Sequence, residues 1–309
     1  MSEVVDLLAL CRVHGISWHF VARQAQRPDG LAELVAGRSS EKSGEASEAL
    51  QLIATAGDEL PRHRDTAEAM LERLRRDGAY ITTVLDDDYP TNLRLIYNLP
   101  PFVTYRGTLQ PDDARSVAVV GTREASREGL EQASRLARQL TEAGVTVLSG
   151  LARGIDTAAH RATLAAGGRT IAVMGTGIRS IYPPENRELA DEIAATGALV
   201  SQFWPDSPPT TYSFPRRNVV MSGMGQGTVV VEASATSGAK LQARYALEHG
   251  KRVFLLATLV KQRGWAQKYL ERPGAVEVHD VDDIVRLLQS TQAVQARSDQ
   301  RRQLTLALG

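Results

Sequence analysis

The chain has 309 residues, 43% of them hydrophobic, and its 36 basic side chains balance 36 acidic ones. This is the composition of an ordinary globular protein of one large domain or two, and the zero net charge excludes a bulk polycation, so nucleic-acid binding would need a local basic patch. The single cysteine, Cys11, excludes an intramolecular disulfide and a cysteine-based zinc cluster. Because no apolar run is long enough to cross a bilayer, we expect a cytoplasmic protein that does not contact a membrane.

Residues 1–85 predict a small, mainly helical N-terminal domain. Apolar side chains recur at helical spacing over residues 4–10, Ser17 is placed to cap a second short helix, and residues 66–76 are amphipathic. The turn just before Ser17 resembles that of a helix-hairpin-helix, whose backbone amides contact DNA. Residues 38–47 have almost no apolar side chain and predict a flexible loop.

Residues 86–290 predict an α/β domain, and residues 291–309 a tail. Short, β-branched runs without charge are typical of strands covered on both faces, and their alternation with helices predicts a doubly wound parallel sheet. The expected strands, two of them before the alternation begins, are 80–85, 102–105, 117–120, 145–148, 170–174, 199–202, 228–231, 253–256 and 276–278. The expected helices are 126–141, 156–166, 186–195, 217–224, 240–249 and 281–288.

The loops after the expected strands collect glycine, hydroxyl and arginine residues. A parallel α/β sheet binds its ligand beyond the carboxyl ends of its strands, where small residues allow close approach and arginines bind anions. We therefore predict a phosphate-binding site there. Its candidate residues are Gly121, Thr122, Arg123, Ser126, Ser149, Gly150, Arg153, Gly154, Arg179, Arg216, Arg217 and Asn218.

Several side chains in these loops have two interpretations. Ser126 either caps the helix that follows it or helps to hold a phosphate, and both interpretations stay open. Asp156 is expected first of all as an N-cap, while the glycines and Arg153 before it form a nest of amides suited to an oxyanion. Glu232 is either a general base or a structural acceptor of loop amides, and we favour the structural role. His160 is expected to pack or hydrogen-bond locally.

Aromatic residues precede the pair Arg216–Arg217 along the chain. Trp204 and Tyr212 lie a few residues before it, an arrangement that suits single-stranded nucleic acid, because bases stack on aromatic rings and phosphates pair with guanidinium groups. The alternative is a surface arginine pair beside a buried Phe214.

Familiar cofactor and catalytic motifs are missing from the sequence. Gly175-Thr176-Gly177 follows a strand, but Tyr182-Pro183-Pro184 comes next where a dinucleotide site needs a helix N-terminus. The sequence contains no P-loop, no H-E-x-x-H and no G-x-S-x-G run. We therefore expect no cofactor, no metal and no enzymatic activity.

Taken together, these segments resemble the DNA-processing protein A (DprA, also called Smf) family. The residues that carry the resemblance are Tyr89-Pro90, Pro100-Pro101, Gly121-Thr122-Arg123 with Ser126, Ser149-Gly150 with Ala152, Gly154, Asp156 and His160, Gly175-Thr176-Gly177 with Tyr182-Pro183-Pro184 and Asn186, Phe214-Pro215 with Arg217-Asn218, and Val231-Glu232-Ala233 with Ser237-Gly238.

The resemblance covers about residues 88–280 and implies an extended Rossmann-like fold. It also implies a non-enzymatic, homodimeric protein that binds and protects single-stranded DNA and helps to load a RecA-type recombinase during natural transformation. No metal is implied. The residues that it assigns to the nucleic-acid groove are Gly121, Arg123, Ser126, Ser149, Gly150, Gly154 and Arg217.

The chain also departs from the family pattern. Arg179 stands where members usually have an acidic residue, Lys240 adds a second positive charge beside the site, and we expect no C-terminal winged-helix domain. These departures leave recombinase loading open and keep two alternatives. One is a nucleotide-sensing protein, because Gly225-Gln226-Gly227-Thr228 with Glu232 nearly matches the phosphoribohydrolase run. The other is a paralogue that regulates a partner in a phage-defence or toxin–antitoxin system.

Overall fold

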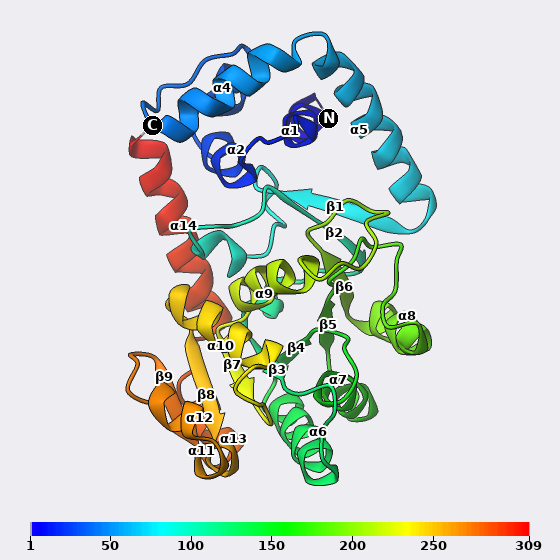
Figure 1. The fold of residues 1–309 in the computed structure, drawn as a ribbon, viewed down its shortest axis with the longest axis vertical. Coiled ribbons are helices and arrows are strands. Elements are labelled where there is room, and N and C mark those ends of the chain that lie inside the picture. Colours follow the sequence, from blue (N-terminus) through cyan, green and yellow to red (C-terminus); the bar gives the residue numbers. More distant parts are fainter. Residues whose placement is uncertain (1, 309) are drawn as a thin grey trace.

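One mixed sheet runs through the molecule in this computed structural model, which describes residues 2–308 (Figure 1). Its strands are β1 (Ala79–Thr83), β2 (Phe102–Gly107), β3 (Ser116–Val120), β4 (Thr146–Ser149), β5 (Thr170–Val173), β6 (Ala198–Ser201), β7 (Gly227–Val230), β8 (Arg252–Leu256) and β9 (Ala275–Val278). The strand order is β1-β2-β6-β5-β4-β3-β7-β8-β9. Strands β3 to β9 are parallel, whereas β2 is antiparallel to β1 and to β6.

Helices cover both faces of the sheet, as the alternation of elements predicts. They are α6 (Arg127–Glu142), α7 (Ile155–Ala165), α8 (Arg187–Thr196), α9 (Ser213–Met224), α10 (Gly238–Glu248), α11 (Ala257–Gln262), α12 (Gly264–Tyr269) and α13 (Val281–Val285). Short 3₁₀ turns lie at η1 (Leu93–Leu95), η2 (Pro111–Ala114) and η3 (Pro184–Asn186). Every residue of β3 is buried: Val117 and Val119 belong to the core on the α6 and α7 side, and Ala118 and Val120 to the opposite core with α9 and α10.

The strand order reverses at β3. The chain runs outward from β3 through β4, β5 and β6, then returns to pair β7 on the other side of β3. Because the connections leave β3 and β7 in opposite directions, a crevice opens beyond the carboxyl ends of these strands, where open α/β sheets bind their ligands. This topology positions the candidate site.

The predicted elements are confirmed with small shifts of their ends. All nine expected strands form, and α9 begins at Ser213, four residues before the expected 217. Helices α11 and α12, which connect β8 to β9, were not among the expected helices. The fold class, a doubly wound Rossmann-like sheet with a mainly helical N-terminal part, is as predicted.

The N-terminal part forms a helical layer over one end of the sheet (Figure 1). Its helices are α1 (Ser2–Arg12), α2 (Trp18–Ala25), α3 (Gly30–Val35), α4 (Gly44–Ala56) and α5 (Glu59–Arg76). Ser17 caps α2 as predicted, because its hydroxyl accepts from the Phe20 amide at 3.2 Å. Trp18 packs on Phe102 of β2 and on Trp204, so the helical layer and the sheet share one core.

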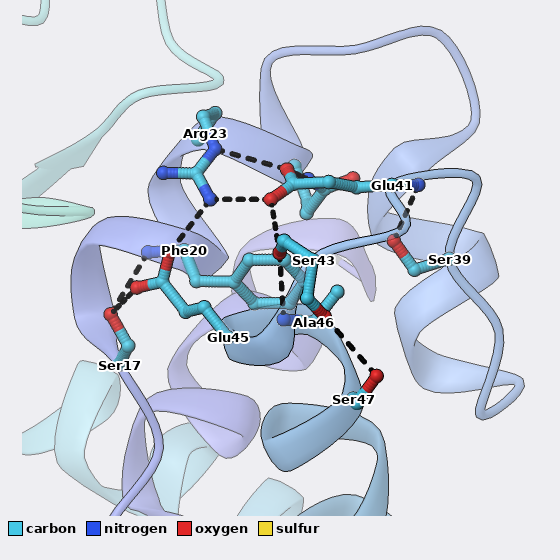
Figure 2. Close-up of polar contacts among 10 residues, drawn as sticks. Ser17, Phe20, Arg23, Ser39, Glu41, Ser43, Glu45, Ala46 and Ser47 are labelled. Carbon is cyan, nitrogen blue, oxygen red and sulfur yellow. Dashed lines mark hydrogen bonds and ion pairs between the residues drawn. The ribbon is translucent and has the colours of Figure 1, made fainter.

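The prediction of a flexible loop over 38–47 is wrong for its last residues. Helix α4 begins at Gly44 and is capped by Ser43. Its buried face begins at Ala46, and the polar composition of residues 38–47 gave no sign of it. The preceding residues are held in place by Arg23, whose guanidinium binds Glu41 at 2.9 Å and Glu45 at 2.8 Å (Figure 2). Charge pairing therefore orders a segment that hydrophobic patterning leaves unassigned.

The tail forms the helix α14 (Thr291–Leu308), which runs from the sheet towards the N-terminal helices (Figure 1). It is attached by polar contacts, among them Arg302 to Asp87 at 2.6 Å. Strand β1 lies in the sheet although it falls within 1–85, and the division into 1–85, 86–290 and 291–309 stays a prediction. Across residues 2–308, no helix combines the length and apolar character needed to cross a membrane.

Candidate functional site

A pocket of about 440 Å³ opens at the point where the strand order reverses. It is lined by the loop after β3, by Ala152 and Asp156 after β4, by the loop after β7 and by the first turns of α9 and α10. We call it the switch-point pocket. A smaller hollow that contains Gly150, Arg153 and Tyr182 adjoins it and shares Arg123, Phe214 and Arg217 with it.

The loop after β3 brings an exposed cation to the pocket. Gly121 has no room for a side chain, because a Cβ atom there would collide with Ile155 and would lie 2.9 Å from the carbonyl oxygen of Glu232. The Thr122 amide donates to the same carbonyl at 2.7 Å and fixes the loop on β7. Arg123 then projects outward, and its guanidinium lies 5.1 Å from the centre of the Phe214 ring. Arg123 makes no ion pair within residues 2–308.

Ser126 and Glu232 have structural roles. The Ser126 hydroxyl caps α6 by accepting from the Gly129 amide at 3.0 Å, and it donates to Glu232 Oε2 at 2.8 Å. The Ser126 amide donates to the same carboxylate oxygen at 3.1 Å. The structural interpretation of Glu232 is thus confirmed, and the capping interpretation describes what Ser126 does here.

The expectation that Asp156 is an N-cap is wrong. The N-cap position of α7 belongs to Gly154, which has φ +74°, and Asp156 lies in the first turn of the helix. Its carboxylate turns back and accepts from the amides of Gly150 at 3.0 Å and Ala152 at 3.4 Å. The predicted nest of amides therefore already binds an internal carboxylate. Burial raises the pKa of Asp156, and the nearby Arg217 and the two amides oppose that rise.

Arg217 lies beneath the pocket and ties three elements together. Its Nη1 donates to the carbonyl oxygens of Gly150 at 2.7 Å and Val173 at 2.8 Å, at the ends of β4 and β5. Its Nε donates to Asn218 Oδ1 at 3.1 Å. A Cβ atom at position 150 would overlap the guanidinium, so a larger residue there would displace Arg217 from its present position. Burial lowers the pKa of Arg217, Asp156 opposes this, and Arg123 adds to it.

Two aromatic rings lie between the exposed arginines of the site. Phe214 and Tyr182 have ring centres 5.7 Å apart, and Tyr182 is 43% exposed. Arg153 stands on the Tyr182 side, where it forms an ion pair with Glu185. Sequence reasoning missed this aromatic pair, because Tyr182 and Phe214 are 32 residues apart in the sequence, although the run Phe214-Pro215 was the available signal.

The structure brings seven of the predicted site residues together and places the other six elsewhere. The seven are Gly121, Thr122, Arg123, Gly150, Arg153, Arg217 and Asn218. Ser126 caps α6, the buried Ser149 donates to the Val119 carbonyl at 2.7 Å, and Gly154 packs under the loop after β3.

The remaining three predicted cations do not line the switch-point pocket. Arg179 is mostly buried and pairs with Asp77 at 2.6 Å and with Asp206 at 3.1 Å. Lys240 lies over the Trp265 ring at 5.7 Å. Arg216 lines a separate groove between α9 and the N-terminal helices. The carboxyl ends of parallel strands bring the following segments together, but the side chains of those segments point in different directions. Arg179, Lys240 and Arg216 are therefore separated from the pocket.

The geometry also bears on His160 and on the glycine-rich run before β7. His160 is buried, and its Nδ1 lies 2.7 Å from Thr170 Oγ1, which confirms the expected local hydrogen bond. The run Gly225-Gln226-Gly227-Thr228 lies at the amino end of β7, at the sheet edge opposite the pocket. The run and the switch-point pocket therefore lie at opposite ends of β7.

Comparison with known proteins places these features in a family. A family model described as DNA recombination-mediator protein A matches residues 80–289. DNA processing protein DprA of Streptococcus pneumoniae is 40% identical over 174 residues, covering 56% of this chain and 61% of that protein. Protein Smf of Escherichia coli is 37% identical over 228 residues, covering 73% of this chain and 61% of that protein. The chain thus matches less than two thirds of the length of either relative.

Two solved structures resemble this fold over most of the chain. The X-ray structure of DprA from Streptococcus pneumoniae superposes with a TM-score of 0.72 and 26% identity, over 92% of this chain and 98% of that one. A DprA structure from Helicobacter pylori has a TM-score of 0.59 and 25% identity, over 67% of this chain and 94% of that one. The description of the latter concerns its single-stranded DNA binding mode.

Proposed function

The chain belongs to the DNA recombination-mediator protein A family, and from this premise we propose that it binds single-stranded DNA in the switch-point pocket without breaking any bond. The observation that carries the proposal is the exposed guanidinium of Arg123, which lies over Phe214 and has no ion-pair partner among residues 2–308, at the place where an α/β sheet binds ligands.

The chemistry of the pocket suits a strand with its bases unpaired. Arg123 reaches a phosphate without first breaking an ion pair, and Arg153 offers a second guanidinium once Glu185 is displaced. Phe214 and Tyr182 offer faces on which bases stack, and stacking contributes about 1–3 kcal/mol per base. Duplex bases have no free faces, so this arrangement favours single strands.

The amides after β4 do not take part. They hold the Asp156 carboxylate, and an anion at the same place would meet that charge. Phosphate recognition therefore depends on guanidinium groups rather than on a backbone nest, and the affinity should fall steeply with salt.

We further propose the family role for the whole protein: protection of single-stranded DNA, loading of a RecA-type recombinase, homodimerisation, and a cytoplasmic location. The alternatives are a nucleotide sensor or a regulator of a partner protein. The pocket of about 440 Å³ also has room for one nucleotide, which is why the test must separate a strand from a monomer.

The deciding experiment is fluorescence anisotropy with a labelled oligothymidylate at several salt concentrations. A salt-dependent complex that unlabelled duplex displaces poorly supports the proposal. Competition by nucleoside monophosphates at similar concentrations of nucleotide would favour the sensor. Normal binding without any effect on recombinase filaments would favour the partner-regulating role.

A further inference from the structure

A second concavity of about 720 Å³ lies between α9 and the N-terminal helices. Its walls are the turn between α1 and α2, the start of α5, the segment after β6, and Arg216 of α9. We call it the α9 groove. The first turns of α9 separate it from the switch-point pocket, since Phe214 and Arg217 line the pocket whereas Arg216 and Val219 line the groove.

The walls of the α9 groove contain basic residues and no acidic residue among those that the structure describes. Two arginines and three histidines line it, and no Asp or Glu is among the lining residues that the structure describes. Those five residues are Arg12, His14, His19, His63 and Arg216. Arg216 is exposed, and neither arginine makes an ion pair within residues 2–308. Unpaired guanidinium groups in an acid-free concavity are suited to an anion.

Three acidic residues beside the α9 groove, Glu45, Glu59 and Asp206, each lie close to a partner of their own, and Asp206 pairs with Arg179 at 3.1 Å. Glu45 is held by Arg23 at 2.8 Å and by the hydroxyl of Ser17, a lining residue of the groove, at 2.6 Å (Figure 2). Glu59 stands 3.9 Å from His63, one helical turn earlier on α5. Burial lowers the pKa of His19, and the charge of Arg216 also lowers it. The two arginines of the groove stay charged, because a guanidinium is effectively always protonated.

The α9 groove also offers what a nucleic-acid backbone and bases need. The turn at its wall has Gly15 at φ +83°, and the amides of His14 and Gly15 donate no hydrogen bond within the described part of the chain. The half-buried Trp204 forms part of the floor, with the Arg12 guanidinium 5.0 Å from its ring centre. Tyr212, the residue before α9, is 79% exposed.

We infer that the α9 groove is a second segment of the single-stranded DNA path: a strand that leaves the switch-point pocket crosses the start of α9 past Tyr212 and continues between Arg216 and Arg12. The inference rests on the proposed function. It assigns a nucleic-acid role to the N-terminal helical layer, and it makes Arg216 and Arg217 act differently, the first on the strand and the second within the protein.

The experiment compares a short oligothymidylate of about 6 nucleotides with one of about 20, by anisotropy over a range of salt. Arg216→Gln should leave the short complex unchanged and weaken the long one about fivefold at about 0.1 M salt, with a salt slope shallower by about 0.7. Arg123→Gln should weaken both. Arg75→Gln is the matched control, because this exposed arginine lies about 18 Å along α5 from His63.

Each other outcome overturns a specific statement. If Arg216→Gln leaves the long complex unchanged while Arg123→Gln weakens it, the proposed function stands and the second segment does not exist. If Arg216→Gln weakens short and long complexes equally, the two-segment path is wrong. If the wild-type chain binds neither oligonucleotide, both proposals fail. As a measurement without substitutions, a photoreactive base placed along the long strand should crosslink to the peptide that contains residues 12–19.

Discussion

The guanidinium of Arg123 lies 5.1 Å from the centre of the Phe214 ring, across the mouth of the switch-point pocket. Arg123 comes from the loop after β3 and Phe214 from the first turn of α9, so the contact joins the two sides of the crevice. It places a cation and an aromatic face side by side, and these are the groups that bind a phosphate and its neighbouring base. The two residues should therefore contribute separately measurable parts of DNA affinity.

Replacing Arg123 with glutamine should weaken binding to single-stranded DNA and flatten its salt dependence. One lost phosphate contact reduces the slope of log K against log salt by about 0.7 and the affinity about fivefold at about 0.1 M salt. Anisotropy titrations at four or more salt concentrations measure both quantities. Arg127→Gln is the matched control, since Arg127 is four residues away, is 94% exposed and pairs with Glu131 instead. Equal slopes for wild type and Arg123→Gln would remove the main support of the proposal.

Replacing Phe214 with leucine should reduce affinity without changing the salt slope. Leucine keeps most of the apolar contact with neighbouring residues but offers no ring for a base, and the lost stacking of about 1–3 kcal/mol corresponds to about 5- to 150-fold in affinity. Urea unfolding should show a cost below about 1.5 kcal/mol. Tyr80→Leu, on the exposed edge strand β1, controls for general loss of an aromatic side chain. A large change in slope would mean that Phe214 acts by positioning Arg123 instead.

The sequence predicted the sheet well because its signal is local. Seven runs such as Val117–Val120 are short and β-branched, six of them carry no charge, and each is followed by a helix, so their ends fix where the loops gather. Gly121, Thr122 and Arg123 could thus be placed in the site from the sequence alone. What the pattern did not contain was the direction in which each side chain turns once the loops have met.

The misplaced residues show this limit. Arg179 is withdrawn by Asp77, which lies 102 residues earlier, and nothing near position 179 signals that partner. Asp156 binds amides that precede its helix because Gly154 takes the N-cap position in a conformation that favours glycine. Arg216 and Arg217 are neighbours in sequence but point to different concavities because successive helical residues lie about 100° apart. Long-range partners, rather than composition, decide these cases.

Replacing Ser126 with alanine should lower stability and leave DNA binding intact. The cap of α6 is lost, which costs about 1 kcal/mol, and Glu232 loses a hydroxyl donor while it keeps the Ser126 amide. Urea unfolding measures the first effect and anisotropy the second. Ser134→Ala, within the same helix at an exposed position, is the control for loss of a serine hydroxyl. A flattened salt slope for Ser126→Ala would revive the phosphate interpretation of this residue.

His160 should make the protein less stable as the pH falls. Thr170 donates its proton to the Val147 carbonyl, so His160 Nδ1–H donates to Thr170 and the buried Nε2 has no partner among the described residues. Burial, assisted by Arg217, lowers the pKa of His160 from 6.5 to about 3. The unfolded chain therefore takes up a proton first, and the stability that the neutral imidazole provides above about pH 6.5 is lost towards about pH 3.

The corresponding measurement is urea unfolding at about pH 7.5 and about pH 5. The pKa difference predicts that His160 lowers the free energy of unfolding by about 2 kcal/mol between these two pH values. The free energy of unfolding of His160→Gln should therefore fall by about 2 kcal/mol less than that of wild type. Burial, with a contribution from Lys251, also lowers the pKa of His249 to about 4. His249 therefore makes stability depend on pH in both wild type and His160→Gln. If His160→Gln has the same pH dependence as wild type, the imidazole is not buried as a neutral group.

Replacing Arg217 with methionine should destabilise the protein first and impair DNA binding as a consequence. The substitution keeps the length of the side chain but leaves the Gly150 and Val173 carbonyls without a donor, and each buried unpaired group costs about 1–3 kcal/mol. It also removes the positive charge beside Asp156, whose burial cost Arg217 offsets. Arg216→Met, at the adjacent exposed position, should unfold at nearly the wild-type urea concentration.

Because Arg217 holds the ends of β4 and β5, its loss should weaken the binding of short and long oligonucleotides alike and shift the unfolding midpoint. A wild-type midpoint with reduced DNA affinity would show instead that Arg217 acts as a direct phosphate ligand.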